Sequence, residues 1–430
     1  MTFDNHPIRL GHERWDRPKP GPIWSAILRQ AALDGRGLRA WQRWIRWSNP
    51  GRPLQRLARL GSALMELATI PLDAARAVRM YGGKVVAGYG ISARRQFIQL
   101  VRVRLRGDSA VSYYKFQLFR PDRWKRSIHF IEDAGVLLQV LSRRVGPSED
   151  AGAVMHKDDF DRWARREGIA CPQTLGVVPP DGRVAWSVER LPPVDLFVKP
   201  TSLRAGMGAA LWRCSDVGKP VWQDEQGRVV DAAGLIACVA DEARKHGQAF
   251  VVQVALRNHP GLQGVTNGAL ATVRLMTVRD GHAIAQPLLA VLRMPVGQAV
   301  TDNFDLGGLA APIDLDSGTC GEALTKRGDY PLDSVTTHPD SGSTIQGLRI
   351  PCWAACVRLA CLAHDRLQAE VAVIGWDVAV LADGPVLVEA NYLPGGNLAQ
   401  VPTGCGLGET AFAGVVVRAL RSRYLPAHRS

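Results

Sequence analysis

Two neighbouring apolar runs within residues 371–391 constrain the fold of this chain more than any other feature. The Asp-Gly pair at 383–384 separates them and is typical of a β-hairpin turn, so we expect two buried antiparallel strands. Both strands nevertheless carry polar side chains, Asp377 on the first and Glu389 and Asn391 on the second. A buried carboxylate is costly unless a cation or dense hydrogen bonding compensates it. The hairpin therefore predicts a cation beside these residues.

The length of the turn decides which of these side chains share a face. A two-residue loop at 383–384 would place Asp377 and Glu389 on opposite faces of the sheet. A three-residue loop, with Gly384 in the left-handed conformation, pairs Leu381 with Pro385 and hence Asp377 with Glu389. We adopt the three-residue loop because it is a common hairpin form.

In that register three oxygen-bearing side chains gather on one face. Asn391 follows Glu389 by two positions, so both point the same way along their strand. Mg²⁺ binds oxygen ligands and is usually held by one or two carboxylates together with substrate phosphates. The prediction is a magnesium site at Asp377, Glu389 and Asn391 that carries a nucleotide. The alternative is a polar edge strand with all three side chains in water.

Length and charge limit the remaining possibilities. The chain has 430 residues, of which 46% are hydrophobic, enough for two or three domains. No apolar run reaches about 18 residues, and the N-terminus lacks the apolar segment of a secretory signal, so we expect a cytoplasmic protein. Residues 1–150 carry 27 Lys and Arg against 12 Asp and Glu, a balance of +15, whereas the remainder has 26 against 28, a balance of −2. The basic third predicts an anionic surface or partner.

The eight cysteines are dispersed, without a Cys-x-x-Cys pair or a zinc-like histidine spacing. Cys352, Cys356 and Cys361 fall on one predicted helix and resemble a metal or redox cluster only superficially. We interpret all eight as reduced, mostly buried apolar residues.

The chain divides into a basic N-terminal part and a mixed α/β part. Residues 1–22 are expected to form an extended arm, and residues 23–90 show amphipathic helical spacing rich in Trp, Leu and Arg. Such helices either pack on a domain or lie on an anionic membrane face. Residues 91–145 mix strand and helix patterns and leave the assignment open. From residue 148 onwards strands and helices alternate, with a helix after Pro351 and strands predicted at 196–200, 249–256, 271–278, 285–294, 371–381 and 385–391.

Basic and glycine residues on other strands suggest a phosphate site. Lys199 ends the strand at 196–200, and a loop with Gly206 and Gly208 follows, so a point charge and backbone amides are available to phosphates. Neither the Walker pattern nor the dinucleotide fingerprint is present. Gln253 ends another strand, in a position suited to a purine.

Arginine on the next strands suggests a carboxylate or acyl phosphate partner. Thr272 and Arg274 alternate on one strand and so share a face. Arg293 follows on the next strand, and guanidinium groups bind carboxylates and phosphates well. Asn303 and the Gly307-Gly308 pair come shortly afterwards.

These segments together resemble the ATP-grasp superfamily. EANYLPGG is similar to the EvNxxPG segment of D-alanine:D-alanine ligases, FVKP to the nucleotide-binding Lys-Pro strand, and HKDDF to the upstream helix that carries a lysine. LRMPVGQAVTDNFDLGGLAAP is similar to a segment of ribosomal-protein glutamate ligases. The running pattern over roughly residues 85–415 resembles the sugar-transfer-associated ATP-grasp proteins most, including GYGISARRQFIQL, SYYKFQLF and GWDVAVLADGPVLVEAN.

The resemblance implies an α+β chain with an ATP-grasp fold, in which two α/β lobes sandwich the nucleotide behind a basic, largely helical N-terminal region. The implied divisions are residues 1–145 for the basic region, 146–252 for the first lobe and 253–430 for the second. The expected catalytic residues are Arg274, Arg293 and Asn303, with Arg293 at the substrate carboxylate. The expected ATP-binding residues are Lys157, Lys199, Gly206, Gly208, Gln253, Gly307 and Gly308. The expected Mg²⁺ ligands are Asp377, Glu389 and Asn391. This chain departs from the family in two places. Many ATP-grasp enzymes have an acidic residue at the position of Gln253. The Mg²⁺ ligands of this chain also include fewer carboxylates than those of some ligases, which favours one Mg²⁺ over two.

The implied activity joins a carboxylate to an amine or other nucleophile through an acyl phosphate, with ADP and phosphate as products, in a pathway near polysaccharide or cell-surface biosynthesis. Two alternatives stay open: a membrane- or glycan-associated protein that uses nucleotide without ligation, and a phosphotransferase. Substrates are expected to be small molecules. An anionic membrane or glycan is a further expected partner for the N-terminal region, on the inner face of the membrane, and nucleic acid is not expected. His259 and His338 are substrate contacts, a catalytic base or turn residues of their loops.

Overall fold

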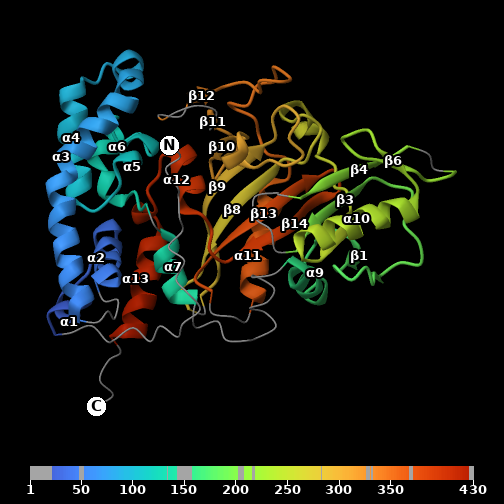
Figure 1. Cartoon of the computed structure of the whole chain (residues 1–430), viewed down its shortest axis with the longest axis horizontal. Helices are drawn as coiled ribbons and strands as arrows, with labels where there is room; N and C mark the ends of the chain where they lie inside the picture. Colours follow the sequence, from blue (N-terminus) through green and yellow to red (C-terminus); the bar gives the residue numbers. More distant parts are fainter. Residues whose placement is uncertain are drawn as a thin grey trace.

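The computed structural model describes residues 22–47, 53–132, 134–142, 157–201, 208–215, 218–281, 283–325, 330, 333–367 and 371–425. A helical N-terminal region lies at one end of the molecule, and two antiparallel sheets of seven strands each, with helices packed on them, form the other part (Figure 1). The predicted arm at 1–22 lies outside the described residues, apart from its last residue. The α+β class predicted from the sequence is confirmed.

The N-terminal region is helical throughout its described part, including the segment 91–145 that the sequence left open. Ser92 and Ser109 explain two of the helix starts, because each hydroxyl accepts a hydrogen bond from a backbone N–H of the first turn. The elements are α1 (Pro22–Arg29), α2 (Gly35–Trp47), α3 (Pro53–Tyr89), α4 (Ala93–Leu105), α5 (Ala110–Lys115), α6 (Pro121–Lys125), the 3₁₀ turn η1 (Ser127–His129) and α7 (Ala134–Ser142).

The first sheet has the order β2-β1-β7-β3-β4-β5-β6, and helix α10 covers one of its faces. Asp231 caps the start of α10, and Gly247 ends the helix in the left-handed conformation. Helix α9 precedes this sheet. The elements are α9 (Lys157–Arg166), β1 (Thr174–Val178), β2 (Ala185–Trp186), β3 (Leu196–Pro200), β4 (Ala210–Cys214), β5 (Trp222–Gln223), β6 (Val229–Val230), α10 (Ala232–His246) and β7 (Phe250–Val254).

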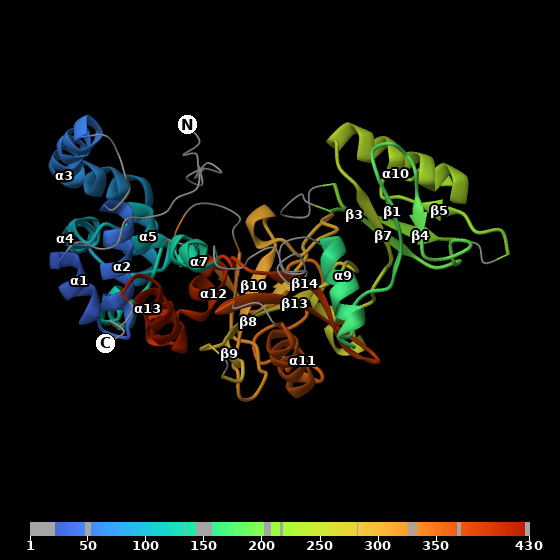
Figure 2. The same ribbon diagram turned by 90° about the horizontal axis from the view of Figure 1, so that it is seen from below.

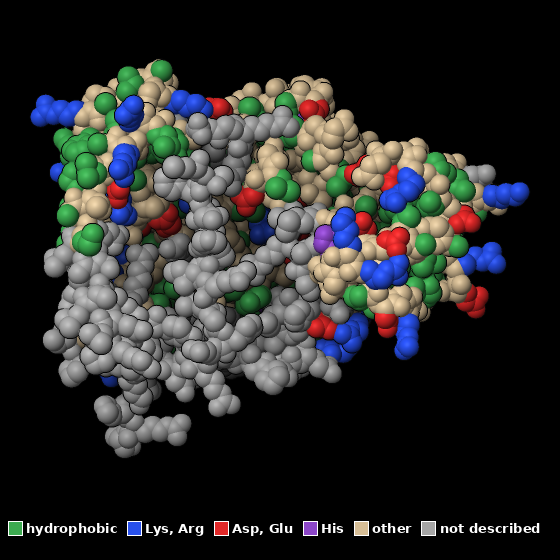
Figure 3. All heavy atoms as spheres, viewed as in Figure 1, with side chains coloured by type: hydrophobic (Ala, Val, Ile, Leu, Met, Phe, Trp, Pro, Cys, Tyr) green, Lys and Arg blue, Asp and Glu red, His purple; other side chains and the backbone are tan. Residues whose placement is uncertain are grey.

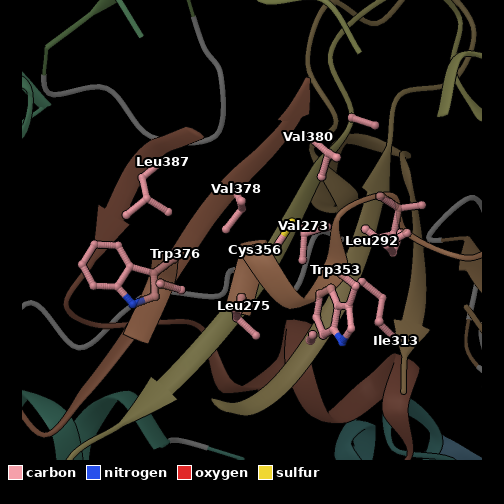
Figure 4. Close-up of a cluster of buried hydrophobic side chains, with 14 of the residues drawn as sticks. Val273, Leu275, Leu292, Ile313, Trp353, Cys356, Trp376, Val378, Val380 and Leu387 are labelled. Atoms are coloured by element: carbon pink, nitrogen blue, oxygen red, sulfur yellow. The ribbon is translucent and has the colours of Figure 1, made fainter. Parts of the chain in front are cut away.

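The second sheet has the order β12-β11-β10-β9-β8-β13-β14, and helix α11 packs on its apolar face. Figure 4 shows that face, where Val273, Leu292 and Val378 point toward Trp353 and Cys356 of α11. Figure 2 shows both sheets between α10 and α11. The elements are η2 (Pro260–Val265), β8 (Thr272–Val278), β9 (Gln286–Met294), η3 (Phe304–Leu306), β10 (Leu309–Ile313), β11 (Ala323–Thr325), β12 (Asp333–Val335), α11 (Trp353–Arg366), β13 (Val373–Leu381) and β14 (Gly384–Asn391).

The β13–β14 hairpin pairs Asp377 with Glu389 as predicted, but for a different structural reason. Leu381 pairs with Gly384, so the loop has two residues, and the predicted three-residue loop is wrong. A bulge at Val388 then inserts one extra residue into β14, so that Asp377 lies opposite Glu389 after all. The predicted pairing of the two carboxylates is confirmed, although its cause is the bulge and not the turn.

The C-terminal helices return to the N-terminal region. These are α12 (Gly396–Thr403), the turn η4 (Leu407–Glu409) and α13 (Ala411–Tyr424). Tyr424 of α13 packs against Trp41 and Trp44 of α2. The side chain of Gln400 accepts from the backbone N–H of Ile131 and donates to its carbonyl, both at 2.9 Å. The predicted division between residues 252 and 253 lies within β7, and the proposed domain limits stay predictions.

Candidate functional site

Two arginines and one aspartate meet on the face of the second sheet opposite to α11. Arg274 lies directly across from Asp377 on the neighbouring strand, and its Nε and Nη2 donate to the Asp377 carboxylate at 2.5 and 3.2 Å. Arg293 Nη2 donates to Asp377 Oδ2 at 3.0 Å. The side chains of Arg274, Arg293 and Asp377 are 11, 13 and 8% exposed. The cations that compensate Asp377 in the structure are therefore these two guanidinium groups, whereas the sequence predicted Mg²⁺ beside it.

Asp302, which was not predicted from the sequence, completes the network. Its carboxylate accepts from Thr272 Oγ1 at 2.5 Å and lies 3.2 Å from Arg293 Nη2. Thr272 Oγ1 in turn accepts from Arg293 Nε and Nη2 at 3.2 and 2.6 Å. Asp302 immediately precedes Asn303, but its burial is a tertiary property that no sequence spacing reveals.

The charges in this network depend on one another. Burial alone would raise the pKa of Asp377, but Arg274 and then Arg293 hold that pKa below its ordinary value. Burial raises the pKa of Asp302, an effect that Arg293 and Thr272 offset only in part. Burial would lower the pKa of Arg293, yet the carboxylates of Asp302, Asp377 and Glu389 raise it. Arg293 is therefore a permanent cation and Asp377 a permanent anion at neutral pH.

Among the described residues, the hydrogen bonds of both guanidinium groups use Nε and Nη2. Arg274 and Arg293 bind Asp377, Asp302 and Thr272 through Nε and Nη2. Within the described part of the chain, Nη1 of neither arginine contacts a protein acceptor. Two cations fixed by one carboxylate are suited to binding the oxygens of a carboxylate or phosphate group.

The predicted metal ligands fit a divalent ion in part. Glu389 lies across the strand from Asp377, and Asn391 donates through Nδ2 to the carbonyl of Gly375 at 3.3 Å, which leaves its amide oxygen for another partner. Asp377 already accepts three hydrogen bonds of about the four that a carboxylate accommodates. Over the described ranges, no group of three or more His, Cys, Asp or Glu side chains is arranged to hold a metal. The donor set is thus two carboxylates and one amide, with Asp377 shared between arginines and ion.

Lys199 and Gln253 lie on the first sheet and share one of its faces. Gln253 pairs with Phe197, which is two residues before Lys199, so both side chains point away from α10. Lys199 and Gln253 are 7 and 6% exposed. Gln253 Nε2 donates to Thr174 Oγ1 at 2.9 Å, an interaction that orients its amide.

The other predicted phosphate-binding residues are described only in part. Lys157 is the first residue of α9, and its side chain lies outside the described residues, as does Gly206. Gly208 is exposed, with a positive φ of 74°. The predicted roles of these three residues stay predictions.

Asn303, Gly307 and Gly308 form one tight turn after β9. Asn303 caps η3 by accepting from the N–H of Asp305 at 2.9 Å, and Gly307 has a left-handed φ of 98°. A Cβ on Gly308 would lie 2.9 Å from the carbonyl oxygen of Asn303. The turn therefore requires glycine at Gly308 for close packing, and it places Asp302 against Arg293.

The two loop histidines are structural in the geometry observed. His259 Nδ1 accepts from the N–H of Gly261 at 3.0 Å and so caps η2. His338 is fully buried, with Nε2 2.9 Å from the carbonyl of Pro295.

All eight cysteines are free thiols in the structure, and their reduced state stays a prediction. Only Cys320 and Cys356 are buried, so the prediction that most of the eight are buried is wrong. Cys356 is buried and Cys352 is exposed, although both lie at the start of α11. Burial raises the pKa of Cys356 to about 12 and that of Cys361 to about 11. Neither is a reactive thiolate at neutral pH.

Comparison with known proteins identifies the fold family. Residues 139–413 match the family model described as sugar-transfer-associated ATP-grasp. The chain belongs to the sugar-transfer-associated ATP-grasp family. No curated protein sequence matches the chain.

Solved structures of several ligases are similar to this ATP-grasp chain. The D-alanine–D-alanine ligase from Bacillus anthracis is 14% identical with a TM-score of 0.34, over 64% of this chain and 70% of the ligase. The L-amino acid ligase from Bacillus licheniformis is 13% identical with a TM-score of 0.36, over 68% of this chain and 55% of the ligase. The D-alanine–D-alanine ligase from Coxiella burnetii is 14% identical with a TM-score of 0.36, over 68% and 67%.

Membership of the ATP-grasp family confirms the predicted fold and makes ATP-dependent ligation the expected class of activity. In the part of the chain that the structure describes, no helix is both long enough and apolar enough to cross a membrane.

Proposed function

We propose that this chain is an ATP-dependent ligase that activates a substrate carboxylate as an acyl phosphate and joins it to an amine or another nucleophile. The observation that carries the proposal is the pair of buried arginines, Arg274 and Arg293, fixed by Asp377 through Nε and Nη2, with no described acceptor bound to Nη1 of either. Because the acyl phosphate and the carboxylate are both anionic, one cationic pair can hold the substrate before and after activation.

The reaction balances without a further reactant. An oxygen of the substrate carboxylate attacks the γ-phosphorus of ATP, the bond from that phosphorus to ADP breaks, and an acyl phosphate forms. The nucleophile then attacks the acyl carbon, phosphate leaves, and the nucleophile loses its proton. Arg293 and Arg274 orient the carboxylate and neutralise charge that develops on it, since a fixed cation costs no reorganisation during the reaction.

The buried acids maintain this arrangement. Asp377 holds both guanidinium groups in place, and Asp302 with Thr272 fixes the remaining edge of Arg293. Lys199 and Gln253 on the first sheet, with Lys157 and the loop at Gly206 and Gly208, bind ATP in this proposal, and Asn303, Gly307 and Gly308 lie beside the carboxylate.

Magnesium belongs to the proposal as the partner of the ATP phosphates. Glu389 and Asn391 would hold it, with Asp377 contributing the lone pair that the arginines leave unused. When bound, the ion neutralises phosphate charge and aligns the γ-phosphate. Glu389 lies opposite Asp377, and its carboxylate is one of the groups that raise the pKa of Arg293.

The test combines the purified chain with ATP, Mg²⁺ and pooled small carboxylates and amines, and follows products by mass spectrometry. A ligase yields ADP together with a new mass equal to the two substrates minus water. A phosphorylated compound without condensation would identify a phosphotransferase instead, and nucleotide binding without any product over a broad panel would identify a binding protein.

The variant Glu389→Gln tests the role of the proposed Mg²⁺ ligand Glu389. We expect it to lower ATP turnover by at least about a hundredfold, because it removes charge at the ion that carries the phosphates. Asp383→Asn, in the exposed turn of the same hairpin, makes an equivalent charge change and should keep full activity. Equal turnover in wild type and Glu389→Gln would remove this face of the sheet from the reaction.

The family name places related proteins near sugar transfer. We propose that the product enters polysaccharide or cell-surface biosynthesis and that the protein works in the cytoplasm. Genetic deletion that leaves surface polysaccharide unchanged in composition would contradict this setting without affecting the ligase proposal.

A further inference from the structure

We propose that the outer face of the α3–α4 helix pair binds the surface of an anionic lipid membrane. This face lies at the end of the molecule farthest from the first sheet (Figures 1 and 2). It consists of the outward-pointing residues of α3 from Met65 to Tyr89 and of α4 from Arg94 to Leu105, and is called the α3–α4 face below. The inference is independent of the proposed ligase activity.

The α3–α4 face exposes large apolar side chains in a regular row. Met65, Leu72 and Met80 of α3 are 71, 59 and 57% exposed, and Leu105 of α4 is 58% exposed. The spacing of seven and eight residues places the three α3 side chains on one side of that helix. Scattered exposed apolar residues are ordinary, but a row from Met65 to Met80, along about 22 Å of helix, indicates a surface that binds something.

Basic side chains lie between these apolar residues. Arg76 and Arg79 share the outer side of α3 with Leu72 and Met80, and α4 exposes Arg94, Arg95 and Arg102 beside Ile98 and Leu105. Figure 3 shows apolar and basic side chains together over this part of the molecule.

Acidic side chains are nearly absent from the same helices. The sequence of α4 contains no Asp or Glu. In α3 beyond Met65 the acids are Glu66 and Asp73, and Asp73 is bound to Arg104 at 3.2 Å. The arginines of the α3–α4 face therefore project a positive charge that the two helices do not neutralise.

The position of Arg94 and Arg95 supports an external anion. Both lie in the first turn of α4, next to the positive end of the helix dipole, where arginine is unfavourable and acidic residues are favoured. A cost of this kind in the isolated protein is offset if anionic headgroups lie against the turn.

A membrane fits this surface better than the other anionic partners do. A glycan has no apolar interior for Met65, Leu72 and Met80, whereas the boundary of a bilayer accepts apolar side chains and binds arginine at the same depth. A second copy of the chain would bring five arginines against five arginines, since a symmetric interface pairs a surface with itself.

The first measurement is sedimentation of the full chain with vesicles, either pure phosphatidylcholine or phosphatidylcholine with phosphatidylglycerol. Binding should require phosphatidylglycerol and weaken as salt is raised, since salt screens the attraction. Equal binding to both vesicle types, or no binding to either, overturns the proposal. If neither vesicle type is bound, the apolar row would instead be a binding surface for another protein.

The charge variant is R94E/R95E, compared with R183E/K219E in exposed loops of the first lobe. Removal of each arginine from an anionic surface costs about fivefold in affinity, so R94E/R95E should bind at least about 25-fold more weakly, and R183E/K219E should bind as wild type does. Because Glu suits the first turn of a helix, R94E/R95E should also melt no lower than wild type. If both variants lost the same amount of vesicle affinity, binding would depend only on the net charge of the protein, and the assignment to α4 would be overturned.

The apolar variant separates lipid from a soluble polyanion. Leu72→Ser with Met80→Ser should weaken binding to the mixed vesicles by at least about tenfold, because apolar burial is lost at two sites. Val229→Ser with Ile284→Ser, which changes residues 56 and 77% exposed elsewhere, is the matched control and should have no effect. Wild-type vesicle binding by the Leu72 and Met80 variant, with equal affinity for dextran sulfate, would overturn the membrane assignment.

Discussion

At the scale of single residues, buried charge is stabilised by neighbours that serve several groups at once. Asp377 accepts from two guanidinium groups, and Thr272 both donates to Asp302 and accepts from Arg293. Sequence alternation placed Arg274 and Thr272 on one face, and the pairing of strands then brought Arg293 and Asp377 to them. Asp302 was not predictable, because it reaches the network from a loop.

A second buried network surrounds His364 on the apolar side of the same sheet. Trp376 Nε1 donates to Thr277 Oγ1 at 2.9 Å, and the Thr277 hydroxyl lies 2.8 Å from His364 Nδ1. His364 Nε2 lies 2.8 Å from the carbonyl of Val371. Every polar atom is satisfied if His364 is neutral with its proton on Nε2, and burial then lowers the pKa of His364 to about 4.

This pKa gives a prediction for the pH dependence of stability. The unfolded chain protonates His364 below its ordinary pKa of 6.5, whereas the folded chain does so only near 4. The unfolded state therefore binds more protons in this window, and the free energy of unfolding should fall with decreasing pH by up to about 1.4 kcal/mol per pH unit. Urea unfolding at pH values from 7 down to about 5 measures the slope.

Two histidine variants test whether His364 causes this pH dependence. His364→Gln should flatten the slope, because the titrating group is gone, whatever its effect at pH 7. His246→Gln, at the partly exposed end of α10, should keep the wild-type slope. Parallel curves for wild type and His364→Gln would show that His364 does not carry the dependence.

At the scale of elements, the long apolar strands were predictable and the local irregularities were not. The predicted strand at 196–200 coincides with β3, and the other predicted strands differ from β7, β8, β9, β13 and β14 by at most two residues at either end. Strands β2, β5 and β6 have two residues each and give no periodic pattern. The bulge at Val388 leaves no mark in the sequence, because Val suits an ordinary strand position as well.

The turn after β9 gives a prediction at this scale. Gly308→Ala introduces a Cβ that would lie 2.9 and 3.0 Å from the carbonyl oxygens of Asn303 and Met294, and neither backbone group can move alone. We expect a loss of about 1–3 kcal/mol in the free energy of unfolding and a displaced Asp302, with reduced ATP turnover. Gly395→Ala, with a φ of −62° and no atom near its Cβ, is the control and should remain close to wild type. Unchanged stability in Gly308→Ala would mean that the turn adapts without cost.

At the scale of the whole molecule, the hydrophobic cores do not follow the chain order. Helices α12 and α13 come last in the sequence, yet Phe412 and Val416 of α13 share a core with Trp41 and Leu38 of α2. That core also includes Met276 and Leu289 of the second sheet, so the N-terminal helices and the second lobe are one packed body. Sequence patterns identified the helices within residues 23–90 as amphipathic but could not assign their partners, since periodicity shows a buried face and not what covers it.

The first sheet has a core of its own, and this difference leads to a prediction about unfolding. Leu235 and Val252 belong to a cluster made only of residues from the first lobe, between 175 and 252. Because that cluster shares no buried residue with the others, we expect calorimetry to resolve two transitions. Leu235→Ala should lower one transition, by about 2–5 kcal/mol of stability, and leave the other in place, whereas Leu38→Ala should do the reverse. A single transition that both variants shift equally would mean that the two lobes unfold as one cooperative unit, and that the interface between the sheets is as strong as the cores themselves.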